Sequence, residues 1–290
     1  MELAALLKPL EFGFMQNAFL ICMIVSVPTA LLSCFLVVRG WALMGDAISH
    51  AILPGIVLAY IFALPLILGA FAAGMTCALA TGYLSNNSRV KQDTVMGVVF
   101  SGMFGIGITL YVAIDTNVHL NHVLFGNMLG VGAEDLWTAG IISTLVAAGL
   151  ASKWKDLLLT SFDPAQAQAS GLRVVWLHYG LLAGLSLTIV ATLTAAGLIL
   201  AIGLLIAPGA IAYLTVRKFS TMMVVSVLVC MASMLAGTYA SFFLDSAPAP
   251  TIVLILTAVF IVAFVRRQIL TRRASTRRVD MAQGGVTPAE

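Results

Sequence analysis

The residues best suited to chemistry are Asp46 and His50, which stand four positions apart in the apolar segment Trp41–Pro54. On a helix, side chains at positions i and i+4 lie on one face, about one turn apart. If the segment crosses a bilayer and is counted inward from Arg39, Asp46 lies roughly 10 Å deep and His50 roughly 16 Å deep in an apolar core about 30 Å thick. A carboxylate at that depth is unfavourable by at least about 2 kcal/mol unless something compensates its charge. A divalent cation would do so.

The two ligand types indicate which cation is suited to such a site. One carboxylate oxygen and one imidazole nitrogen favour Mn(II), Fe(II) or Zn(II) over an alkali ion or Cu(I). Two ligands are too few for tight binding, which fits a conduit that must release its ion. Water, backbone carbonyls near Pro54, or the same pair of a second subunit would complete the coordination. The alternative is that Asp46 and His50 bond to each other or to a neighbouring helix as a packing device; ionisable residues inside membranes are functional by default.

A second possible cluster consists of His119 and His122, in the connection that runs from Asp115 to Asp135. Their three-residue spacing places two imidazoles on one helical face, where they would gather metal or receive a delivering partner. No third ligand follows at metal-site spacing, so two solvated loop histidines are the favoured interpretation.

The composition places this pair in a membrane protein. Of 290 residues, 61% are hydrophobic and 9% are charged, whereas about a quarter of residues are charged in soluble domains. These values exclude a large soluble catalytic domain. The net charge of +3 is small and the cations stand between apolar runs, which argues against nucleic-acid binding. The four isolated cysteines have no disulfide or zinc spacing and are expected to be small core residues: Cys22, Cys34, Cys77 and Cys230.

The apolar runs predict an all-α, polytopic transmembrane bundle of eight or nine spans in one domain, residues 1–268. Cutting the chain where charge interrupts a run of about 20 residues gives nine segments, at 14–38, 41–64, 65–84, 94–113, 136–152, 176–197, 199–216, 219–244 and 250–266. Two cuts are weak. Only a turn near Pro65 separates the second and third segments, and nothing charged lies between Arg173 and Arg217.

The positions of lysine and arginine predict the orientation. They collect in alternate connections, and such connections are cytoplasmic in membrane proteins. Nine spans then place the N-terminus outside and the C-terminus in the cytoplasm. The tail, residues 269–290, is polar and rich in arginine, so we expect a disordered segment held near anionic lipid.

One inner connection has the signals of a short helix. Asp163 is a good N-cap, Pro164 fits the first turn, the alanines and glutamines from Ala165 to Ala169 favour helix, and Gly171 is a C-terminal stop. An isolated helix this short is marginal. Docking into a groove of a cytoplasmic protein would explain it, and a surface helix resting on the bundle has equal weight.

The chain lacks the motifs of nucleotide binding and hydrolysis. It contains no G-x-x-x-x-G-K-[ST], no H-E-x-x-H and no G-x-S-x-G. We therefore expect no enzymatic activity of its own, and the energy for transport would come from a gradient or from a partner protein.

Three strings carry a resemblance to a known family. Residues 35–55, FLVVRGWALMGDAISHAILPG, resemble the signature of permease subunits of bacterial manganese/zinc/iron ABC importers. The segment Phe162–Gly171 resembles the cytoplasmic coupling segment of that family, and Gly203–Ala212 resembles one of its late spans. The resemblance covers roughly residues 12–268, and the arginine-rich tail lies beyond it.

The resemblance implies a permease of the bacterial inner (plasma) membrane that works as a dimer. Its partners would be two cytoplasmic ABC ATPase subunits, which bind the ATP, and an extracytoplasmic metal-binding protein that delivers the ion. The metal path then carries over onto Asp46 and His50, and the coupling role onto Asp163, Pro164 and the residues up to Gly171. The wording of Gly40–Gly45 is closest to manganese/iron importers with two different permease chains, so both a homodimer and a heterodimer remain open.

Two other transport mechanisms remain open at this point. A proton-coupled secondary carrier would use His50 as its proton-sensitive group and need no ATPase. An ABC permease for a metal chelate would need a roomy apolar cavity in place of a direct ligand pair.

Overall fold

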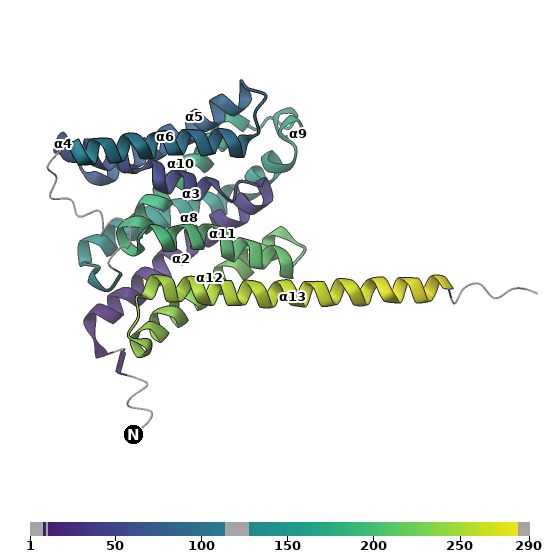
Figure 1. Ribbon diagram of the computed structural model, residues 1–290. Coiled ribbons are helices and arrows are strands. Elements are labelled where there is room, and N and C mark those ends of the chain that lie inside the picture. Colours follow the sequence, from purple (N-terminus) through teal and green to yellow (C-terminus); the bar gives the residue numbers. More distant parts are fainter. Residues whose placement is uncertain (1–7, 10, 114–127, 284–290) are drawn as a thin grey trace, which may run out of the picture.

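The computed structural model describes residues 8–9, 11–113 and 128–283, and all regular structure in these ranges is helical (Figure 1). The helices are α2 (Gly13–Arg39), α3 (Met44–Ala51), α4 (Leu53–Ile61), α5 (Leu66–Asn86), α6 (Gln92–Ala113), the 3₁₀ turn η1 (Met128–Gly130), α8 (Ala133–Phe162), α9 (Pro164–Ala169), α10 (Val174–Ala196), α11 (Leu198–Thr215), α12 (Phe219–Leu244) and α13 (Pro248–Gln283).

Within the described ranges, nine helical segments are long and apolar enough to cross a membrane, with α3 and α4 together forming one of them. The predicted all-α polytopic bundle is therefore confirmed. Both weak cuts are real helix breaks. Ala63, at φ 50°, lies in the turn between α4 and α5, and Gly197, at φ 81°, separates α10 from α11. Glycine adopts a positive φ without steric cost. Because the helix is broken at Gly197, α10 and α11 are two separate spans.

Two helices run further than the apolar pattern predicts. The apolar segment at 136–152 belongs to α8, which continues past Lys153 and Lys155 to Phe162. The last helix, α13, continues to Gln283 and projects as a single rod beyond the bundle (Figure 1). The structure thus differs from the disorder predicted for the tail, because residues 269–283 extend that helix. Charge marks where a segment leaves an apolar layer, whereas arginine and alanine are good helix formers and let the backbone hydrogen bonding continue.

Helix α2 lies at the centre of the bundle, where it packs against α8, α11 and α12. Its contact with α11 is close because of one serine and one glycine. Ser33 Oγ accepts a hydrogen bond from the Gly209 backbone N–H at 2.9 Å and donates one to the Ile206 carbonyl at 3.1 Å. A Cβ atom at Gly209 would lie 2.5 Å from the Ser33 backbone. These contacts fix α11 against α2 at the level of Pro208.

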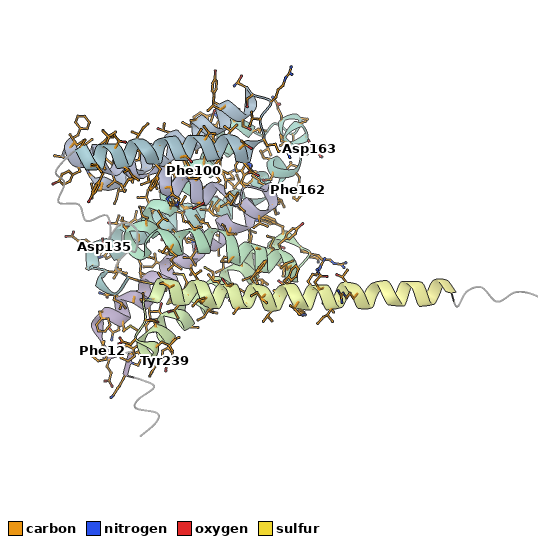
Figure 2. The ribbon with its side chains drawn as sticks, viewed as in Figure 1. Phe12, Phe100, Asp135, Phe162, Asp163 and Tyr239 are labelled. Atoms are coloured by element: carbon orange, nitrogen blue, oxygen red, sulfur yellow. The ribbon has the colours of Figure 1, made fainter. Side chains whose placement is uncertain are left out.

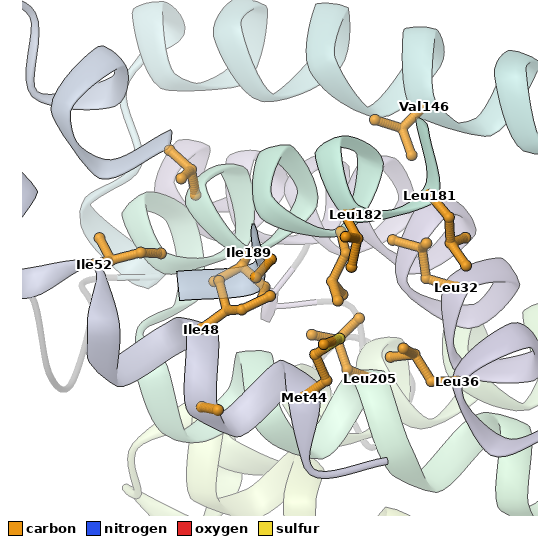
Figure 3. Packing of buried hydrophobic residues seen from close by; sticks show 14 of the residues in the cluster. Leu32, Leu36, Met44, Ile48, Ile52, Val146, Leu181, Leu182, Ile189 and Leu205 are labelled. Atoms are coloured by element: carbon orange, nitrogen blue, oxygen red, sulfur yellow. The ribbon is translucent and has the colours of Figure 1, made fainter. Parts of the chain in front are cut away.

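Helix α3 follows α2 after a short reversal of the chain. Gly40 closes α2 at φ 70°, and the Trp41 N–H returns to the Leu36 carbonyl at 2.8 Å. One face of α3 is buried in the main hydrophobic cluster, in which Met44 and Ile48 pack with residues of α2, α10 and α11, including Leu205 (Figure 3). The burial of this face holds α3 at a fixed rotation about its axis.

The crossing of α4 and α5 depends on two facing glycines. A Cβ atom at Gly55 would meet the Gly69 carbonyl, and a Cβ atom at Gly69 would meet the Gly55 carbonyl and the Ala59 side chain. Small residues permit this close approach of helix backbones where lipid supplies no hydrophobic drive.

We expect Gly69→Ala to destabilise the protein by about 1–3 kcal/mol, because the new methyl group forces the α4 and α5 backbones apart. Gly140→Ala in α8 is the matched control, since a Cβ atom there meets nothing within 4 Å. Thermal unfolding of the two variants in detergent measures the difference. Equal melting temperatures would show that the crossing tolerates a side chain.

Candidate metal-ion site

Asp46 and His50 lie together on the face of α3 that the core leaves uncovered. His50 Nε2 is 3.4 Å from Asp46 Oδ1, and the two side chains are 28% and 35% exposed respectively. The predicted i, i+4 arrangement on one helical face is therefore present. The buried residues Ala47 and Ile48 hold the opposite face of α3 in the core, so the pair points away from the hydrophobic cluster.

The imidazole of His50 is bounded by two phenylalanines of α6. Its ring lies 6.0 Å from the Phe100 ring and 5.3 Å from the Phe104 ring, centroid to centroid. Phe100 is labelled on α6 in Figure 2. The two rings are four residues apart and thus share a face of their helix. The two phenylalanine rings limit the rotation of the imidazole. This restricts the direction from which its nitrogen atoms can bind an ion.

Beyond His50 the structure has an apolar cavity of about 270 Å³. Ser49 and His50 form part of its lining, and Phe104, Tyr111, Leu193 and six other apolar residues form the rest. The cavity gives the imidazole access to open space on the side away from Arg39. Its wall offers few polar groups, so the Asp46–His50 pair is the place in this region where an ion finds charged or strongly coordinating ligands.

The pair is not part of a larger protein cluster. In the part of the chain that the structure describes, no group of three or more His, Cys, Asp and Glu side chains is close enough together to hold a metal ion. A single copy of this chain thus offers two side-chain ligands at Asp46 and His50. The partial exposure of both side chains leaves room for further ligands from water or from another chain.

The predicted short helix is present at one end of the bundle. Asp163 Oδ1 accepts a hydrogen bond from the Gln166 N–H at 2.9 Å, and Pro164 begins α9. At its end, Gly171 has φ 80°, and the Leu172 N–H bonds the Ala167 carbonyl at 3.1 Å. The N-cap and the C-terminal stop that the sequence predicts are therefore both confirmed. Figure 2 shows Asp163 at the end of the bundle from which α13 projects.

Helix α9 has one buried residue and an exposed remainder. Ala167 is fully buried, and α9 packs against α8 and α10. Ala165 and Ala169 are exposed, as are Asp163, Pro164 and Gly171. The helix thus rests on the bundle by one face, as one of the two predicted arrangements has it. Docking of its exposed face into a cytoplasmic protein stays a prediction.

A contact not predicted from the sequence joins the two regions. Arg39 Nε donates a hydrogen bond to Ser161 Oγ at 2.8 Å. Arg39 ends α2, just before the turn into α3, and Ser161 stands two residues before the cap of α9. The sequence marks Arg39 as a charge at a membrane boundary but has no signal for its partner 122 positions away. The same holds for Phe100 and Phe104, whose proximity to His50 arises only in the folded bundle.

His119 and His122 lie in residues 114–127, outside the residues that the structure describes. The candidate contact with metal or with a delivering partner thus stays a prediction from the sequence.

Comparisons with known proteins agree on one family. A family model described as the ABC 3 transport family matches residues 11–267. The chain is 51% identical over 266 residues to the chelated iron transport system membrane protein YfeD of Yersinia pestis, covering 90% of this chain and 88% of that protein. It is 42% identical over 260 residues to the manganese transport system membrane protein MntB of Synechocystis sp., covering 90% of this chain and 85% of that protein.

A solved structure has the same arrangement of helices. PsaBC from Streptococcus pneumoniae, determined in complex with a Fab, superposes with a TM-score of 0.81 at 33% sequence identity. The match covers 90% of this chain and 95% of that chain.

Proposed function

The chain belongs to the ABC 3 transport family, and from that membership we propose that it is the multi-pass permease subunit of an ATP-driven importer. Its cargo is a divalent transition-metal ion, manganese foremost and also iron or zinc, carried across the bacterial inner membrane. The observation that carries this proposal is the Asp46–His50 pair on an apolar span, with 3.4 Å between Nε2 and Oδ1. Two relatives are named as membrane proteins of a manganese and of a chelated iron transport system, and these names support the same class of cargo.

The chemistry of the pair suits a transient stop for an ion. The Asp46 carboxylate supplies negative charge in an apolar layer, where an uncompensated charge is costly, and His50 supplies a nitrogen ligand. Oxygen and nitrogen ligands together accept Mn(II), Fe(II) and Zn(II). With two side-chain ligands the ion is held weakly enough to leave, and the Phe100 and Phe104 rings keep the imidazole in place as ions come and go.

The energy input would arrive at α9. The chain has no phosphate-binding loop, so ATP binding and hydrolysis are assigned to separate cytoplasmic ABC ATPase subunits. The outward face of α9, with Ala165 and Ala169, would dock into a groove of the ATPase. In this proposal α9 and the C-terminus lie on the cytoplasmic side, and the distribution of lysine and arginine supports that orientation.

A second permease chain, identical or different, would cover the open side of the ion pair. Gly97, Ser101 and Gly105 lie at helical spacing on α6, the helix that also carries Phe100 and Phe104. A Cβ atom at Gly97 or Gly105 meets nothing within 4 Å. A partner helix would approach closely over these small residues and bring further ligands near Asp46 and His50. An extracytoplasmic metal-binding protein would deliver the ion at the opposite end, with His119 and His122 as candidate contacts.

The experiment that tests this function is uptake into liposomes that contain the permease with its ATPase. We expect Mn(II) added without a chelator to accumulate in the liposomes. Accumulation should require ATP on the side of the membrane that faces the ATPase and a delivering protein on the other side. Uptake by the permease alone, driven by a pH gradient, would replace the proposal with a proton-coupled carrier. Uptake of a chelate in preference to the bare ion would replace it with a chelate permease, for which the apolar cavity beyond His50 is the specific supporting feature.

A further inference from the structure

A second cavity lies at the opposite end of the spans, between the ends of α2, α5, α8 and α10 and the start of α9. Its volume is about 590 Å³, and its polar lining includes Arg39, Trp41, Tyr83, Ser161, His178 and Tyr179. It does not include Asp46 or His50. The cavity is thus separate from the candidate metal-ion site, although the same α2–α3 turn borders both.

Arg39 is the charged group of this cavity with unfulfilled hydrogen bonding. Its Nε bonds Ser161 Oγ at 2.8 Å, and its guanidinium carbon lies 4.8 Å from the centre of the Trp41 ring. Its Nη2 is buried and has no hydrogen-bond partner among the described residues. Buried donors are nearly always paired, and an unpaired charged donor is especially unfavourable. The guanidinium therefore has an unmet donor, and a small rotation of the Arg39 side chain, which lines the cavity, would bring that donor to an acceptor bound there.

The lining carries positive and no negative charge. Arg39 is a cation, and none of the lining residues is Asp or Glu. The nearest acid along the chain is Asp163, which follows Ser161 by two positions. Its carboxylate caps α9 through Gln166 and is exposed. An anion is thus the ligand class that this cavity fits, and a planar guanidinium is well matched to phosphate oxygens.

The rest of the wall indicates which anion. Trp41, Tyr83 and Tyr179 are side chains of the kind that gather at the level of lipid headgroups. Leu79, Val174 and Leu182 add an apolar wall that a small inorganic ion would not need. The distribution of lysine and arginine places this end of the spans at the cytoplasmic leaflet, where anionic lipids concentrate and basic pockets between spans bind their headgroups.

We propose that this cavity binds the phosphate of one anionic phospholipid from the cytoplasmic leaflet, with Arg39 as its principal ligand. The Arg39 guanidinium turns toward the cavity so that Nη2 pairs with a phosphate oxygen. The aromatic rings flank the glycerol region, and the apolar wall contacts the start of an acyl chain. The bound lipid fills the space between the α2–α3 turn and the α8–α9 junction. The lipid thereby links the α2–α3 turn, which precedes the proposed metal-binding helix α3, to the end of α8, which leads into α9.

Native mass spectrometry of the purified transporter tests the proposal, with phosphatidylglycerol and phosphatidylcholine as the two probes. The wild-type protein should retain one phosphatidylglycerol in preference to phosphatidylcholine. Arg39→Gln should weaken this retention by at least about tenfold, because a hydrogen bond to a charged group is lost. Arg39→Lys keeps the charge and should retain more lipid than Arg39→Gln. Arg217→Gln is the matched control, an exposed arginine outside this cavity, and should retain lipid as the wild type does.

Three results would overturn the proposal. Equal retention by Arg39→Gln and Arg217→Gln would show that Arg39 is not the ligand. Displacement of the lipid by excess inorganic phosphate would identify a free phosphate as the occupant. Loss of the lipid when the ATPase binds would assign the acceptor beside Nη2 to a partner protein. If Arg39→Gln does not fold, the wild-type protein is tested alone in the presence of excess phosphate and ATPase. A retained preference for phosphatidylglycerol supports the proposal, and loss of that preference overturns it.

Discussion

Asp46→Asn and His50→Gln should each reduce ATP-driven manganese uptake by at least about 100-fold, with the protein still present in the membrane. Loss of residues that only orient a metal ligand already lowers metal affinity or activity by about 10–100-fold, and each of these changes removes a proposed ligand itself. Both replacements keep the size of the side chain. The measurement is uptake of radioactive manganese into liposomes that hold the assembled transporter.

Asp245→Asn is the matched control for the loss of a carboxylate. Asp245 directly follows the last residue of α12 and is exposed, and its backbone, at φ 49°, has a conformation that asparagine adopts well. This variant should transport manganese as the wild type does. Normal uptake by folded Asp46→Asn and His50→Gln proteins would remove the proposed site.

The same variants separate a metal site from a packing device. In metal-free detergent, Asp46→Asn should be at least as stable as the wild type, because a carboxylate on an apolar span is replaced by a neutral amide. Added Mn(II) should raise the melting temperature of the wild type and leave that of Asp46→Asn unchanged, since a ligand stabilises only the protein that binds it. A lower melting temperature of Asp46→Asn without metal would instead indicate that the pair stabilises the fold.

The double change Ala165→Glu and Ala169→Glu should reduce ATP-driven uptake by at least about tenfold. Both alanines are exposed on α9, so the fold should tolerate glutamate there. In a groove of the ATPase, two unpaired carboxylates would lose their hydration without compensation, a penalty that exceeds the 1.4 kcal/mol corresponding to a factor of ten. Co-purification of the ATPase with the permease should fall in parallel with uptake.

Ser220→Glu provides the control for added negative charge at the same end of the bundle. Ser220 is exposed in the first turn of α12, away from α9. It should leave both uptake and co-purification near the wild-type level. The Mn(II)-induced rise in melting temperature should also persist in the α9 double variant, because Asp46 and His50 are untouched. Wild-type uptake by that variant would rule out α9 as the docking element.

The sequence predicts the number and order of the spans well, because membrane burial is recorded in runs of about 20 apolar residues. It predicts the ends of the helices less well. The segment predicted at 41–64 is two short helices, α3 and α4, preceded by a turn at Gly40. The segment at 136–152 lies within α8, which begins at Ala133 and continues ten residues beyond it to Phe162. Hydropathy reports the apolar layer, whereas backbone hydrogen bonding continues as long as local propensity permits.

The candidate site divides in the same way into a local part and a tertiary part. The shared face of Asp46 and His50 follows from helical spacing, and the cap of α9 follows from Asp163 and Pro164. The flanking of His50 by Phe100 and Phe104 depends on the packing of α6 against α3. The bond of Arg39 to Ser161 depends on the packing of α2 against α8. The hydrophobic periodicity of one segment does not indicate which residues of a distant segment it will contact.

The length of α8 has a mechanical consequence. Its 30 residues form one continuous helix that packs against α2 and α10, and a single residue, Asp163, separates it from α9. At about 1.5 Å per residue this is a stiff rod roughly 45 Å long. A rod of that length that pivots by about 5° at one end carries its far end through roughly 4 Å. If α9 turned α8 by that angle about the end at Phe162, the opposite end of α8 would move by more than the width of an ion, because the helix is unbroken along its length.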